Sequence, residues 1–128
     1  MSECLLSYKQ VKKRKDLIPK PIAINAEMYK KVKYYPLITS RQDDAPNFSM
    51  RLFEIGSNGF TGKHKHSYEH EVYILSGSGI VLKDGEKTEI EKDDCIYIPP
   101  YEVHQLLAGQ SGISFICVVP NKLKNQPD

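Results

Sequence analysis

Short β-type segments, each stopped by a turn signal, constrain the fold of this 128-residue chain more than any other feature. Val, Ile, Tyr and Phe dominate these segments, and Gly, Pro, Asn or Asp follows at intervals of about 8–12 residues. No segment keeps a helical period of 3.6 over ten or more residues. This pattern predicts an all-β sandwich or barrel. We expect one or two strands in 27–39, turns at 41–48 and 56–59, and strands in 49–55, 70–77, 79–85, 86–94, 95–100, 103–109 and 113–120.

Length and charge bound the domain organisation and the partners. A chain of this size forms one domain and buries about two-thirds of its unfolded surface without disulfide staples. We expect an N-terminal arm at 1–17, a β-barrel domain at 18–120 and a polar tail at 121–128. The net charge of +2 is too small to argue for a nucleic acid or a membrane as partner. A small-molecule ligand is the partner that we expect.

The cysteines and the N-terminus indicate a reducing location. Three cysteines at wide spacing form no C-x-x-C pair, which argues against a zinc knuckle or a thioredoxin motif. The N-terminus lacks an apolar signal-peptide region, and no run of about 18 apolar residues is present. We therefore expect a cytoplasmic protein. The basic run Lys12–Lys15 could bind nucleic acid or direct import, but a solvated turn or short helix face explains it better.

Three of the four histidines, His64, His66 and His70, fall within seven residues beside a β-type run, and His104 follows downstream. Residues i and i+2 of a strand project from the same face, so His64 and His66 converge on one point. His70 has the same parity, and a barrel allows His104 to close the site from a distant strand. Separate surface or core histidines are the alternative. The clustering favours a shared divalent transition metal.

Two stretches resemble the two motifs of the cupin family. The segment 59–77 has a glycine, then H-x-H, a further ligand position, and a glycine after six intervening residues. Residues 93–104, DDCIYIPPYEVH, resemble the second motif, with its proline and a fourth ligand at His104. The flanking segments 45–55 and 114–120 also resemble small single-domain cupins. This resemblance implies a cupin-type jelly-roll β-barrel with a metal in its mouth.

The departures from the common motif concern the third ligand and two turns. His70 stands where the common motif has glutamate, whereas Glu71 is one step late and has the opposite strand parity, so we prefer His70 as ligand. Asp93 and Tyr101 replace two glycines of the second motif. The pattern H-x-H-x3-H with a distant histidine, His104, resembles the four-histidine, manganese-containing small cupins.

The resemblance also implies a cofactor and an oligomeric state. Four neutral imidazoles leave the metal its full +2 charge, and imidazole suits Zn, Cu, Fe and Ni. We expect manganese because of the resemblance to the manganese-containing cupins, and not because imidazole ligands favour it. Barrel cupins pair through edge strands, so we expect a homodimer in which residues 18–35 take part.

Strand parity indicates which residues border the site. Val72 and Ile74 follow His70 inward and would form an apolar wall. Arg51 is either a cation at the solvated edge of the sheet or an anchor for an anionic substrate or a donor that orients a ligand. Phe115 and Cys117 share a face of the last strand, as core residues first and pocket lining second.

The expected function is a metal-dependent oxidoreductase, similar to a dioxygenase, that acts on a small organic molecule with the oxidant at an open metal position. A non-oxidative isomerase or lyase of a sugar or oxoacid is an alternative, and activity with redox-inert Zn would favour it. A non-catalytic module that binds a small molecule or a metal is a third. No Ser-His-Asp arrangement, phosphate loop or catalytic carboxylate pair can be placed in the sequence.

Overall fold

The predicted all-β architecture is confirmed by the computed structural model, which describes residues 11–21 and 29–121. The described elements are η1 (Arg14–Asp16), β1 (Lys30–Ile38), α2 (Ser40–Asp43), β2 (Phe48–Phe60), β3 (His70–Lys83), β4 (Glu86–Glu91), β5 (Cys95–Ile98) and β6 (His104–Pro120). The predicted arm at 1–17 is thus described only from residue 11, and the predicted tail only at residue 121. In the described part of the chain, no helix is long and apolar enough to cross a membrane.

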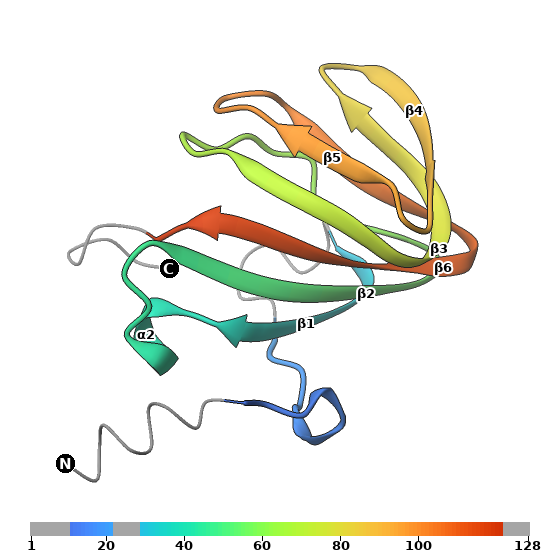
Figure 1. The fold of residues 1–128 in the computed structure, drawn as a ribbon. Helices are drawn as coiled ribbons and strands as arrows, with labels where there is room; N and C mark the ends of the chain where they lie inside the picture. Colours follow the sequence, from blue (N-terminus) through green and yellow to red (C-terminus); the bar gives the residue numbers. More distant parts are fainter. Residues whose placement is uncertain (1–10, 22–28, 122–128) are drawn as a thin grey trace, which may run out of the picture.

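The strands form a jelly roll from one antiparallel sheet that curves over itself. The hydrogen-bonded order is β1-β2-β6-β3-β4, and β5 pairs with β3. Figure 1 shows β1, β2 and β6 side by side, with β4 and β5 above them and β3 in between. Two long strands, β3 and β6, pair along most of their lengths and run from one layer into the other. The space between the layers holds the core and the histidines.

Bulges replace three of the expected strand breaks. The segment 56–59, predicted as a turn, lies inside β2, where the pairing register shifts between Ile55 and Phe60 and Asn58 has φ of 58°. The segments 70–77 and 79–85 form one strand up to Lys83, and 103–109 and 113–120 join into β6. Glycine and asparagine serve a bulge as well as a turn, and only the pairing with a neighbouring strand distinguishes the two.

Alternation along β3 and β5 separates the core from the surface. His70, Val72 and Ile74 are buried, whereas the residues between them are exposed. β5 alternates in the same way and exposes Cys95 and Tyr97. The side chains with the least exposure are Ile74 at 0% and Ile98 at 1%. One face of each strand therefore packs the interior, as in other half-solvated antiparallel sheets.

The two residues that replace motif glycines keep the glycine conformation. Asp93 has φ of 74° and Tyr101 has φ of 67°, both in the left-handed region. Asp93 accepts a hydrogen bond from the Tyr73 hydroxyl at 2.9 Å, which holds the turn before β5. The second-motif turns are thus preserved without glycine.

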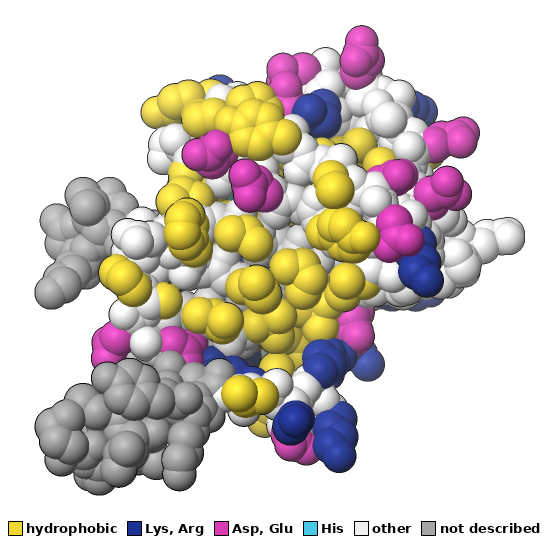
Figure 2. Space-filling model, viewed as in Figure 1, with side chains coloured by type: hydrophobic (Ala, Val, Ile, Leu, Met, Phe, Trp, Pro, Cys, Tyr) yellow, Lys and Arg dark blue, Asp and Glu magenta, His cyan; other side chains and the backbone are white. Residues whose placement is uncertain are grey.

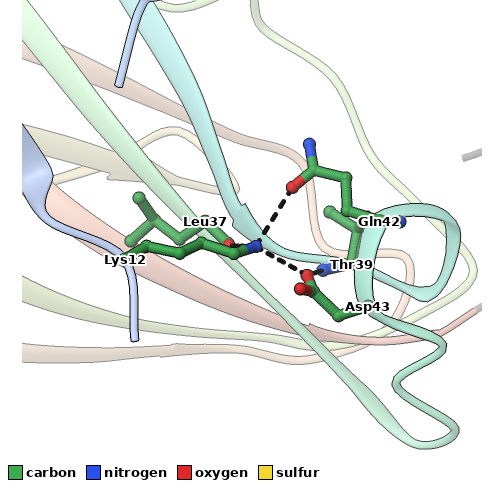
Figure 3. A network of polar contacts seen from close by, with 5 residues as sticks. All are labelled: Lys12, Leu37, Thr39, Gln42 and Asp43. Carbon is green, nitrogen blue, oxygen red and sulfur yellow. Dashed lines mark hydrogen bonds and ion pairs between the residues drawn. The ribbon is translucent and has the colours of Figure 1, made fainter. Parts of the chain in front are cut away.

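The basic run is held against the outer side of the sheet. Lys12 forms an ion pair with Asp43 at 2.8 Å and also donates to the Leu37 carbonyl (Figure 3). Arg14 pairs with Glu54 at 2.8 Å, and its guanidinium carbon lies 3.9 Å from the centroid of the Tyr35 ring. Two of the four cations in this segment therefore hold it against the sheet, whereas the sequence indicated only a solvated turn or short helix face.

The outer side of the sheet also carries apolar side chains. Figure 2 shows them gathered on one face of the molecule. They include the lining of a groove of about 480 Å³, formed in part by Leu37, Met50, Leu52, Leu75 and Ile116. β1 is the last strand at one side of the described sheet. The homodimer through residues 18–35 stays a prediction, and residues 22–28 of that range lie outside the described part.

Candidate metal centre

The segment before β3 places the histidines by strict alternation. From residue 63 to residue 69 the odd-numbered side chains are exposed, whereas His64, His66 and Tyr68 are half-buried and His70 is buried. The segment lies antiparallel to the start of β6, because His64 and His104 exchange two backbone hydrogen bonds, of 3.1 and 2.9 Å. The distant histidine, His104, thus reaches the cluster because this segment pairs with the start of β6.

A buried threonine fixes the start of this segment. The Thr61 N–H donates to the Leu106 carbonyl, and the Thr61 hydroxyl accepts from the Leu106 N–H, both at 3.0 Å. At the other end, the Tyr101 N–H donates to the His66 carbonyl at 2.6 Å. The loop that carries His64 and His66 is therefore tied to the loop and strand that carry His104.

Three histidines have the geometry of a metal site. His64, His66 and His104 each offer a ring nitrogen, and these three nitrogens lie within 4.8 Å of one another. His70 falls outside this set, but its ring centroid lies 4.8 Å from that of His66 and 5.2 Å from that of His104. Its Nε2 atom is buried and has no hydrogen-bond partner among the described residues. An unsatisfied buried nitrogen beside the other three suits a fourth ligand, which stays a prediction.

Hydrogen bonds orient two of the rings. His104 Nδ1 lies 2.9 Å from the Glu102 carbonyl oxygen, which can only accept, so Nδ1 carries the proton and Nε2 keeps its lone pair. His70 Nδ1 lies 3.2 Å from Cys117 Sγ. Because both contacts involve Nδ1, the Nε2 atoms of His70 and His104 stay available to a metal. Metal-binding histidines are usually oriented by such a hydrogen bond at the other ring nitrogen.

Two of the imidazoles, those of His64 and His70, are kept neutral. Burial lowers the pKa of His64 to about 4, with His104 and Arg51 acting in the same direction. Burial, followed by the charge of Arg51, lowers the pKa of His70 to about 3. Metal binding requires the neutral ring, so these two histidines are available as ligands at neutral pH without losing a proton.

The histidines open onto a small cavity of about 130 Å³. Its wall combines apolar and aromatic side chains with one arginine and one cysteine. The lining residues besides the four histidines are Tyr29, Arg51, Phe53, Thr61, Tyr68, Val72, Ile98, Leu106, Phe115 and Cys117.

Four of the five predicted pocket residues lie in this wall: Arg51, Val72, Phe115 and Cys117. The fifth, Ile74, is fully buried in the core and is not a lining residue, although it shares the strand parity of His70. Parity fixes the side of the sheet on which a residue lies, but not its depth along the barrel. The role of these residues in substrate binding stays a prediction.

Sequence reasoning missed the tyrosines of the wall. Tyr68 stacks on His66 and His70, with centroid separations of 4.8 and 5.3 Å. It has the parity of the histidines, a signal that could have identified it. Tyr29 lies 6.4 Å from His64 between ring centroids, and no comparable pattern marks it in the sequence.

The carboxylates of the first motif point away from the cavity. Glu71 is exposed on the opposite face of β3 from His70, as its parity predicted. Glu69 is also exposed and accepts a hydrogen bond from Tyr97. The donor set that the described residues offer to a metal is therefore composed of imidazoles, which fits a transition metal better than Mg²⁺ or Ca²⁺.

Comparison with known proteins finds two curated relatives. An uncharacterized protein of Methanocaldococcus jannaschii is 48% identical over 44 residues, which cover 34% of this chain and 35% of that protein. The dimethylsulfoniopropionate lyase DddW of Ruegeria pomeroyi is 30% identical over 87 residues, or 68% of this chain and 57% of the lyase. The chain thus spans about a third and just over half of the lengths of these relatives.

Among solved structures, the polyketide cyclase RemF of Streptomyces resistomycificus is similar, with 29% identity and a TM-score of 0.79. The match covers 88% of this chain and 79% of the cyclase chain. The family model of the cupin domain matches residues 51–119, which include all four histidines. This chain therefore belongs to the cupin family.

Proposed function

We propose that this protein is a metal-dependent enzyme of the non-oxidative lyase or cyclase type, acting on a small oxygen-bearing molecule in the histidine-lined cavity. The observation that carries the proposal is the convergence of His64, His66 and His104 within 4.8 Å at a cavity with apolar walls. A few polar groups converging in an apolar pocket are typical of a small-molecule site.

The three converging histidines would hold the metal, with His70 as the fourth ligand. Manganese remains the predicted metal by resemblance, while Fe, Zn, Ni and Cu also suit imidazole ligands. When bound, a divalent metal would supply Lewis-acid polarisation of a substrate oxygen.

The side chains around the cluster orient it and exclude water. Tyr68 stacks on two of the imidazoles and limits the rotation of their rings. Val72 and Phe115 close one side of the cavity with apolar surface. Burial raises the pKa of Tyr29 and of Tyr68, so both phenols keep their protons at neutral pH and can donate to a ligand oxygen.

The relatives support non-oxidative chemistry. The curated relative with a named activity is a lyase, and one of the similar solved structures is a cyclase. Bond cleavage or ring closure of these kinds needs polarisation and proton transfer at the substrate, and no external oxidant.

The dioxygenase-like oxidoreductase is the second candidate. The observation that favours it is the imidazole-only cluster among the described residues, because neutral ligands leave a redox-active Mn or Fe its full charge. A module that binds a small molecule without turnover is the outcome if neither activity is found.

Metal analysis of protein purified without added metal tests the site. We expect about one equivalent in the wild type, loss of the metal in His64→Ala and His104→Ala, and weaker retention in His70→Ala. Lys65→Ala is the matched control, because Lys65 is exposed between two of the ligands. Equal metal content in all of these variants would refute the site.

The reaction class is tested with Zn- and Mn-loaded protein, under argon and in air. Dimethylsulfoniopropionate and short 2-oxo acids serve as probes, followed by NMR. Turnover under argon with Zn supports the lyase or cyclase type. Turnover that requires both air and Mn would support the oxidoreductase instead, and binding without turnover would support the binding module.

A further inference from the structure

Arg51 lies near the start of β2 and lines the histidine-lined cavity. It is paired in register with Cys117 of β6, and both side chains are part of the cavity wall. Phe53, two residues further along the strand, lies on the same wall, whereas Leu52 between them lies in the groove on the outer side. Of the sequence alternatives, the solvated edge of the sheet is therefore excluded for Arg51.

The guanidinium of Arg51 lacks strong acceptors. Its Nε atom is buried and has no hydrogen-bond partner in the described structure. Its Nη2 atom donates to Cys117 Sγ at 3.4 Å, and sulfur is a weak acceptor.

No described carboxylate balances the charge of Arg51. The ion pairs between described residues are Lys12–Asp43, Arg14–Glu54 and Lys83–Glu102, and none of them involves Arg51. The described residues that line the cavity include neither Asp nor Glu. Arg51 is partly buried. Burial of a charge without a counterion costs free energy, so an anion that enters this cavity would gain Arg51 as a charged partner.

We propose that Arg51 binds the carboxylate of a short organic acid, and that this class of molecule is the natural ligand of the cavity. The planar fork of a guanidinium matches a carboxylate with two parallel hydrogen bonds. The wall contains no lysine, and its other polar groups are imidazoles, phenols, one hydroxyl and one thiol. In the metal-free cavity, a single cation of the protein suits a singly charged carboxylate better than a dianionic phosphate.

The cavity limits the size of the acid. A volume of about 130 Å³ is close to that of an engineered cavity that holds benzene, which has six non-hydrogen atoms. Short 2-oxo and 2-hydroxy acids are of this size. Their second oxygen would lie toward the histidines when the carboxylate is at Arg51, and this part of the inference rests on the proposed function.

Binding of pyruvate and of its uncharged amide, pyruvamide, tests the proposal by titration calorimetry on the Zn-loaded and the metal-free protein. A charge-assisted hydrogen bond predicts that the wild type binds pyruvate about 10- to 100-fold more tightly than pyruvamide. Arg51→Gln should lose this preference, and Arg51→Lys should keep part of it, because lysine retains the charge but not the fork. Arg14→Gln, which removes a cation from the outer side of the sheet, should behave as the wild type.

The wild-type comparison needs no variant, so the proposal stays testable if Arg51→Gln does not fold. For the metal-free protein, equal binding of pyruvate and pyruvamide, no binding of pyruvate, or binding of inorganic phosphate as tight as that of pyruvate would each overturn it. Metal content is measured in the same samples. A wild-type protein that binds no metal but still prefers pyruvate to pyruvamide would contradict the proposed function alone. A wild-type protein that binds metal but does not prefer pyruvate to pyruvamide would contradict only this inference.

Discussion

Replacement of Cys117 by alanine should weaken both metal binding and the fold. Cys117 Sγ is 3.2 Å from His70 Nδ1 and 3.4 Å from Arg51 Nη2, so one sulfur contacts a buried and a partly buried polar group. Without it, the His70 ring loses the contact that sets its orientation. Loss of an orienting partner typically costs 10- to 100-fold in metal affinity, and we expect a loss in this range if His70 is the fourth ligand.

The expected loss of stability follows from the same two contacts. A buried polar group that loses its partner costs about 1–3 kcal/mol, and a thiol is a weak partner, so we use the lower end for each contact. The free energy of unfolding of metal-free Cys117→Ala should therefore be about 2 kcal/mol lower than that of the metal-free wild type. Cys117→Ser keeps a donor and an acceptor at the site and should recover part of both losses.

Zinc affinity is measured by competition with a chromophoric chelator, and stability by guanidinium unfolding of the metal-free protein. Cys95→Ala is the matched control, because Cys95 is exposed on β5 and the structure records no contact between it and a described histidine. A folded Cys117→Ala protein that binds zinc as tightly as Cys95→Ala would refute the positioning role of Cys117.

Three further predictions concern the framework of the site, and urea unfolding measures the stability change in each. Ile74→Ala should cost about 2–5 kcal/mol because this side chain is 0% exposed, whereas Leu75→Ala, at 40% exposure, should cost far less; similar losses would contradict the assigned core. Gly77 and Gly85 both have positive φ, of 81° and 84°, but only at Gly77 would a Cβ meet a backbone carbonyl of β6. Gly77→Ala should therefore destabilise the protein more than Gly85→Ala; equal effects would show that the backbone strain of a positive φ is the only cause. Thr61→Val removes the acceptor of a buried N–H of β6 and should cost about 1–3 kcal/mol and loosen metal binding, whereas Thr61→Ser should restore both; a neutral Thr61→Val would contradict this link.

The turn-like segment 56–59 shows where local sequence reasoning reaches its limit. Its composition is equally typical of a hairpin turn and of a bulge, and the structure places it inside β2. The same holds for Gly77 and Gly112, which lie at bends of single long strands. Pairing with a strand that is distant in sequence makes the choice, because hydrogen bonds across the sheet satisfy the backbone that a turn would otherwise expose.

The sequence by itself determined the all-β class and the shared face of His64, His66 and His70, because alternation in a strand is a local property. It also determined that Glu71 points away from them. Only the tertiary structure decided that Arg51 faces the cavity and that Ile74 does not border it. Both residues have a side of the sheet fixed by parity, but depth in the barrel depends on strand order and register. Those depend on which surfaces can be buried together, a property of the whole chain.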